Sequence, residues 1–169
     1  WRESGVKNAV HRDDNSYTGA AYIFVEEATG DNAIIVCPGA AGDISNKDID
    51  ENAQLIQSSA ILLTQLEQPI PVAEYALKMA RSAGVTTILN PAPAAPLDNA
   101  MIALCDYATP NETEASDITG IEVVSVDDAR AAGDELLKRG AGCAVITLGA
   151  QGALFHSIDR SIHVGAIDA

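Results

Sequence analysis

Short apolar runs alternate with amphipathic segments through the second half of this sequence. Within one such segment Ala73, Ala76, Leu77 and Ala80 fall on a single helical face. An alternation of strands and helices is typical of a parallel sheet with right-handed crossovers, so the pattern predicts an α/β fold. The runs that we expect to form its strands cover residues 61–64, 85–89, 106–109 and 143–147.

The part of the chain before residue 45 has another pattern. Residues 18–25 and 32–37 are rich in β-forming residues, and the loop between them is short, polar and contains glycine. Two such runs predict a β-hairpin. Tyr22 and Phe24 alternate in period two with Ala20, which would give the hairpin an apolar face. An ordinary hairpin at a sheet edge is the simpler interpretation.

Capping residues and glycines predict where the helices begin and end. Ser45 is a suitable N-cap, and we expect its helix to run to about Ser58. Gly84 is expected to end the next helix. The remaining predictions are a short helix over 97–104, a helix from Ser125 to Gly140 or Gly142, a turn at 157–160 and a return strand at 162–164.

Composition narrows the class of protein. The chain has 169 residues, 47% of them hydrophobic and 20% charged, which fits a single globular domain over 1–169 without repeats or linkers. The net charge of −14 argues against a nucleic-acid partner, which normally requires a basic surface. No apolar run reaches the ~18 residues of a membrane span, so we expect no membrane contact.

The three cysteines, Cys37, Cys105 and Cys143, have no Cys-x-x-Cys spacing and lie in or beside apolar runs. Free thiols in a reducing compartment are expected, and this favours the cytoplasm. The histidines, His11, His156 and His163, show no metal-ligand spacing, so we expect them at the surface or at strand edges.

The segment Asp106–Glu114 carries the first candidate chemistry. Pro110 stops a strand, and Asn111 is a good N-cap with Glu114 three residues later. A capping box is the simpler interpretation. The alternative is that an amide and carboxylates at the end of a strand hold Mg²⁺ beside a nucleotide, because open α/β sheets bind ligands there.

Two further loops follow predicted strands. Residues 148–152 contain two glycines in a tight turn, where backbone N–H groups can approach an anion, although a plain β-turn has the same pattern. No Lys-Ser/Thr pair follows, so this is not a Walker A loop. Glu67 lies just past the strand at 61–64, and the proline-rich residues 90–96 follow the strand at 85–89.

Four segments together resemble the PfkB family of sugar kinases, and within it the ribokinase branch. The resemblance covers nearly the whole chain but only the middle of such an enzyme. It implies part of a three-layer α/β/α sheet, with residues 18–41 as a lid that clasps a second subunit in a homodimer. The matching segments are Leu63-Thr-Gln-Leu-Glu-Gln-Pro69, Asn90-Pro-Ala-Pro93, Asn111-Glu-Thr-Glu114 and Thr147-Leu-Gly-Ala-Gln-Gly152.

The resemblance also implies roles for individual residues. Glu67 would bind the sugar, and Glu114 would organise Mg²⁺ through water. A K⁺ site of the family would lie outside this chain. The nucleotide would contact Asn111, Thr147, Leu148, Gly149, Ala150, Gln151 and Gly152.

The activity that the resemblance implies is transfer of the γ-phosphoryl group of ATP to O5 of D-ribose, giving ribose 5-phosphate. The family's Gly-Ala-Gly-Asp segment, which holds its catalytic base, does not occur in this sequence. We therefore expect the central portion of a kinase, inactive by itself. Fructose, 2-keto-3-deoxygluconate or a nucleoside remain alternative substrates, and a nucleotide-binding α/β fragment or a self-pairing fragment remains an alternative class.

Overall fold

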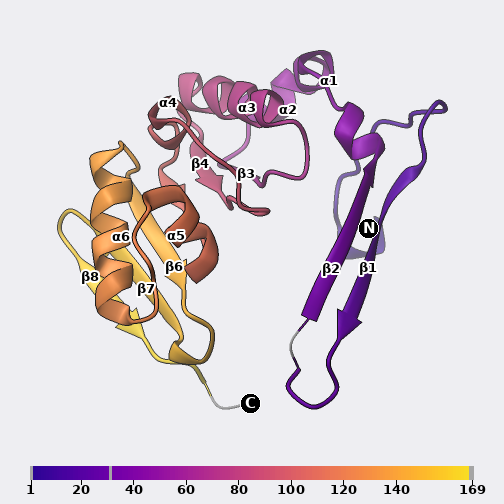
Figure 1. The fold of residues 1–169 in the computed structure, drawn as a ribbon. Helices are drawn as coiled ribbons and strands as arrows, with labels where there is room; N and C mark the ends of the chain where they lie inside the picture. The colour runs from indigo at the N-terminus through magenta and orange to yellow at the C-terminus, as the bar shows by residue number, and fades with distance from the viewer. Residues whose placement is uncertain (1, 31, 168–169) are drawn as a thin grey trace.

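The computed structural model describes residues 2–30 and 32–167 and contains two separate sheets (Figure 1). The first is an antiparallel hairpin of β1 (Thr18–Val25) and β2 (Asn32–Gly39), which confirms the predicted hairpin. The second has six strands in the order β3-β4-β5-β6-β7-β8. These are β3 (Ile61–Thr64), β4 (Thr86–Leu89), β5 (Tyr107–Ala108), β6 (Cys143–Thr147), β7 (Ala153–Ser157) and β8 (Ser161–Val164).

The six-stranded sheet is mixed. Strands β3 to β6 pair in parallel, as the alternation of strands and helices predicts. Strands β7 and β8 then return antiparallel to their neighbours. The sheet therefore confirms the α/β class and the return strand after the turn at 157–160.

Helices connect the parallel strands. They are α3 (Ile70–Ser82), α4 (Asn99–Ile102), α5 (Glu112–Thr119) and α6 (Val126–Lys138). Because sequential strands are also neighbours in the sheet, right-handed crossovers place all these helices on one face. The core lies between that face and the helices, where Leu89, Ala144, Ile146 and Leu154 are almost inaccessible.

The opposite face of the sheet is more open. Leu63 points to it and is 65% exposed, and Ile61 is 53% exposed. The described residues thus supply the sheet and one helical layer of the expected three-layer arrangement.

Two predicted helix boundaries are wrong. The single helix expected from Ser45 to Ser58 is divided into α1 (Asn46–Glu51) and α2 (Ala53–Gln57), because Asn52 leaves the helical conformation with φ −106° and ψ 10°. The helix expected over 97–104 covers only α4, because the side chain of Asp98 accepts a hydrogen bond from Met101 N and caps a later start.

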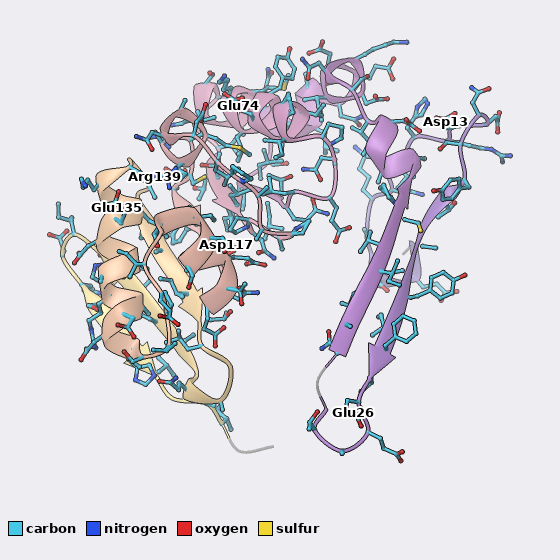
Figure 2. All side chains as sticks on the ribbon, viewed as in Figure 1. Asp13, Glu26, Glu74, Asp117, Glu135 and Arg139 are labelled. Carbon is cyan, nitrogen blue, oxygen red and sulfur yellow. The ribbon has the colours of Figure 1, made fainter. Side chains whose placement is uncertain are left out.

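The hairpin stands apart from the core. Figure 2 shows its side chains projecting to either side of the ribbon, with Glu26 in its loop. Every residue of β1 is exposed, and β2 is exposed over most of its length.

Short 3₁₀ turns lie at Arg2–Ser4, Ala40–Asp43 and Gly149–Gln151. Within the described ranges no helix combines the length and apolarity needed to cross a bilayer.

Candidate functional site: four loops at one edge of the sheet

The loops that follow β3, β4, β5 and β6 meet at one edge of the sheet, because these strands are parallel neighbours. Backbone hydrogen bonds join each loop region to the next. Leu66 N donates to Ala92 O at 2.8 Å, and Thr109 N donates to Leu89 O at 2.8 Å. Thr147 N donates to Pro110 O at 3.0 Å. The four segments singled out in the sequence therefore form one continuous edge.

The loop after β3 presents Glu67 to solvent. Leu66 is buried and anchors the loop in the core. Gln68 Nε2 donates to Gln65 O at 2.6 Å and to Thr64 Oγ1 at 2.9 Å, which closes the turn. Glu67 itself is exposed and has no hydrogen bond or ion pair among the described residues. Its carboxylate is free to accept from the hydroxyl of a ligand.

The segment after β5 forms the capping box that the sequence predicts. Asn111 Oδ1 accepts from Glu114 N at 2.8 Å, and Glu114 Oε2 accepts from Asn111 N at 2.9 Å. Glu114 is only 8% exposed. Its second oxygen, Oε1, accepts no hydrogen bond in the part of the chain that the structure describes. The cap therefore uses one carboxylate oxygen and leaves the other for water or a metal-bound water.

The loop after β6 is a 3₁₀ turn at Gly149–Gln151. Leu148 is buried and anchors it, and Leu148 N donates to Gly152 O at 2.8 Å. Gly149 and Gly152 have φ of 47° and 93°, values that favour glycine. A Cβ at Gly152 would also collide with the carbonyl oxygen of Val164. Among the residues that the structure describes, the N–H groups of Gly149 and Ala150 donate no hydrogen bond, so both are available to an anion.

Two contacts that hold this turn were missed by the sequence analysis. Gln151 Nε2 donates to Val124 O at 3.2 Å, and His163 Nε2 donates to Gln151 O at 2.6 Å. His163 belongs to β8 and reaches the loop only because β8 lies beside β7. Sequence spacing carries no signal for such a contact.

One expectation about the histidines is wrong. His163 is exposed on an edge strand as expected, but His156 is only 8% exposed. Its ring nitrogens bond to Ser161 Oγ at 3.0 Å and to Asp134 Oδ1 at 2.9 Å. The ring packs against Gly133 of α6, where a Cβ would lie 2.7 Å from the ring. His156 thus joins α6 to the start of β8.

The structure brings together only part of the predicted site. Asn111, Glu114 and residues 147–152 follow adjacent strands, and Glu112 Oε1 lies close to Gly149. Glu67 follows β3, which is two strands from β5. At ~4.8 Å per strand, that places the Glu67 loop roughly 10 Å along the edge. A ligand that reaches every loop must be extended along this edge.

Comparison with known proteins identifies relatives of this chain. The model of the pfkB family carbohydrate kinases matches residues 1–169. A ribokinase of Staphylococcus aureus is 38% identical over 149 residues, which are 88% of this chain and 49% of that protein. A deoxyribokinase of Salmonella typhi is 35% identical over 150 residues, again 88% of this chain and 49% of the other.

Solved structures agree in fold. A structure of Arabidopsis thaliana ribokinase complexed with ribose and ATP matches with a TM-score of 0.82 at 27% identity. The match covers 95% of this chain and 54% of that one. The present chain therefore spans about half the length of the relatives that it matches.

Proposed function

Because this chain belongs to the pfkB family of carbohydrate kinases, we propose that it is the central part of an ATP- and Mg²⁺-dependent kinase that phosphorylates D-ribose at O5. The observation that carries the proposal is the edge of four hydrogen-bonded loops. It offers a free carboxylate at Glu67, a cap at Asn111 and Glu114, and an N–H-rich turn at 147–152. The ribokinases among the relatives support ribose as the sugar.

Each loop has a separate part in this proposal. Glu67 accepts a hydrogen bond from a sugar hydroxyl and orients the sugar. Asn111 and the turn from Thr147 to Gly152, which includes Leu148, Gly149, Ala150 and Gln151, bind the nucleotide. The N–H groups of Gly149 and Ala150 bind the negatively charged phosphates of the nucleotide. This local attraction offsets the repulsion between those phosphates and a protein of net charge −14.

Glu114 fits the role of an acid near Mg²⁺. Mg²⁺ prefers oxygen ligands and keeps several of its waters, so a carboxylate with one free oxygen suits an outer-sphere contact. When bound, the ion would neutralise charge on the transferred phosphoryl group. Glu114 Oε2 stays fixed by Asn111 N, which holds Oε1 in place to accept from a bound water.

Catalysis in this proposal rests on positioning and charge neutralisation. The sugar-binding loop and the nucleotide loop are held in register by the hydrogen bonds along the sheet edge. The group that accepts the proton of the 5-hydroxyl is assigned to the parent enzyme outside these 169 residues, together with a K⁺ site. The chain alone is then expected to lack turnover.

In this proposal residues 1–169 belong to a single kinase domain. The hairpin region, residues 18–41, is the lid of that domain. Tyr22 and Phe24 share one face with Ile35, and Ile23 shares the other with Val36. All five are exposed by more than half. One face would cover the sugar, and the other would pack on the lid of a second copy in a homodimer in the cytoplasm.

A second substrate is favoured by a specific observation. The deoxyribokinase of Salmonella typhi is nearly as similar to this chain as the ribokinases are. 2-Deoxy-D-ribose is therefore the second candidate sugar. A nucleotide-binding module without kinase activity would instead bind ATP and phosphorylate neither sugar.

The test uses the parent enzyme that contains this chain, assayed with D-ribose, 2-deoxy-D-ribose and D-fructose. Glu67→Ala should raise the KM for the sugar by about tenfold or more and lower kcat, because a charged hydrogen bond is lost. Glu74→Ala, on α3 and paired with Lys78, is the matched control and should leave both constants unchanged. Unchanged ribose kinetics in Glu67→Ala would remove Glu67 from the site.

Glu114→Gln separates the metal role from the cap. Glutamine still accepts from Asn111 N, so the helix start is kept. The Mg²⁺ concentration that gives half-maximal rate should rise, while the KM for ribose stays nearly constant. An unaltered Mg²⁺ titration would leave Glu114 with the role of a helix cap alone.

A further inference from the structure

Three side chains that can bind metals meet at the base of the hairpin, outside the four loops described above. They are His11, Asp48 and Glu51, and one donor atom of each lies within 4.8 Å of the donor atoms of the other two. His11 precedes β1, whereas Asp48 and Glu51 belong to α1, which follows β2. The group therefore joins two segments that the whole hairpin separates in sequence.

The two carboxylates share one face of α1, because they are three residues apart. Asp48 Oδ2 accepts from Ser45 N at 2.9 Å and from Ser45 Oγ at 2.7 Å. These bonds fix the orientation of the carboxylate, and no bond to Oδ1 is found among the described residues. Asp48 can therefore offer Oδ1 to an ion without losing the helix cap.

The other two donors are also available. Glu51 is paired with Lys47 only at 3.7 Å, and both side chains are largely exposed, so that pair is weak. The ring of His11 has no hydrogen bond within residues 2–30 and 32–167. A hollow of about 530 Å³ lies beside His11 and leaves room for water ligands. In Figure 2 the neighbouring Asp13 marks this region at the base of the hairpin.

The donor set selects a class of metal. An imidazole nitrogen with carboxylate oxygens suits Zn²⁺ and similar first-row divalent ions, whereas Mg²⁺ prefers oxygen alone. Zn²⁺ bonds to nitrogen and oxygen are about 2.0–2.2 Å long, so small rotations of the exposed His11 and Glu51 side chains toward the half-buried Asp48 would bring the three donors around one ion. The net charge of −14 also favours a bound cation.

From this arrangement we infer that His11, Asp48 and Glu51 form a site for a Zn²⁺-like divalent ion, with water completing its coordination. The ion joins the segment before the hairpin to the helix after it, and so fixes the base of the hairpin. The inference does not depend on the kinase function, because none of its residues belongs to the four loops.

The experiment is calorimetric titration of the full chain, free of any histidine tag, with ZnCl₂ in a non-chelating buffer without nucleotide. One ion should bind per chain. His11→Ala and Glu51→Gln should each weaken binding by about tenfold or more, since each removes one of three protein ligands. Far-UV circular dichroism of the variants verifies that α1 and the sheet persist. An excess of MgCl₂ should displace little Zn²⁺.

Two control variants isolate the site. His163→Ala removes another exposed histidine, and Glu114→Gln alters the carboxylate assigned to Mg²⁺, so both should keep the affinity of the unmodified chain. Absence of saturable binding, or equal Zn²⁺ affinity in His11→Ala, would overturn the inference. A loss of affinity in Glu114→Gln alone would also overturn it, because the ion would then occupy the kinase site.

Discussion

The hairpin and the body, which is the six-stranded sheet with its helices, both contain strands rich in apolar residues. These apolar side chains are exposed in the hairpin and buried in the body. Tyr22 and Phe24 in β1 are 66% and 59% exposed, whereas Leu89 and Ile146 in the body are at most 1% exposed. In both regions the strands are paired by backbone hydrogen bonds. Strand pairing therefore depends on the local pattern, but burial depends on whether another element covers the strand.

Helices make this difference. Strands β3, β4 and β5 are each followed by a helix that returns over the same face, and apolar positions of α3 and α6 fill the space between. The hairpin has no helix between its strands, so both of its faces stay open. An isolated two-stranded hairpin is marginal in water. The proposed function as a lid would account for its exposed apolar faces, because one face would cover the sugar and the other would pack on the lid of a second copy.

The largest expected effect is a contrast in stability between the two regions. Leu77→Ala, in the core of the body, should lower the free energy of unfolding by about 2–5 kcal/mol, because it leaves a cavity. Phe24→Ala should change it by no more than about 0.5 kcal/mol in dilute protein. Urea denaturation at low protein concentration measures both. Equal losses would mean that the hairpin packs on the body.

A second contrast compares two glycines with positive φ. Gly152→Ala should destabilise the chain by about 2–4 kcal/mol, because strain adds to the collision with the Val164 carbonyl. Gly30→Ala, in the hairpin loop, has open space around it and should cost only about 1 kcal/mol. Thermal unfolding followed by circular dichroism provides the values. If Gly30→Ala were the more damaging change, the hairpin loop would be packed rather than free.

The smallest effect concerns thiol reactivity. Burial raises the pKa of the Cys105 thiol to about 12, and burial also raises the pKa of the Cys143 thiol. Cys37 lies half-exposed on the hairpin. With a disulfide reagent at pH 8, one thiol per chain should react quickly and all three only after unfolding, because the thiolate is the reactive form. Rapid modification of Cys105 would show that the body opens readily.

The raised pKa of Cys105 has a further consequence with a definite sign. Between the ordinary thiol pKa near 9 and the folded value of about 12, the folded chain holds a proton that the unfolded chain has lost. Stability should therefore fall as the pH rises through this window. Cys105→Ser or Cys105→Ala should flatten that fall, as urea denaturation at pH 8 and pH 10 would measure.

Much of the fold could be predicted because its signals are local. The hairpin, the strands at 61–64 and 143–147, and the capping box at Asn111 follow from periodicity and cap chemistry over a few residues. The division at Asn52 was missed because the backbone of a single residue leaves the helical conformation there. The later start of α4 was missed because a single side chain, that of Asp98, caps it. The roles of Glu67 and the nucleotide loop remain predictions, for which the structure supplies position and availability.

The sequence by itself determined which segments form strands, where Asn111 caps a helix, and where Gly149 and Gly152 permit a tight turn. Tertiary structure alone decided the contacts between distant residues. Arg139, for example, donates to Leu97 O at 2.6 Å and to Asn99 Oδ1 at 2.7 Å, and so ties the end of α6 to the start of α4. The same holds for His163, which bonds to the turn at 149–151, and for His11 beside α1. Backbone preferences act over a few residues, whereas such contacts exist only once the order of the strands has brought remote segments together.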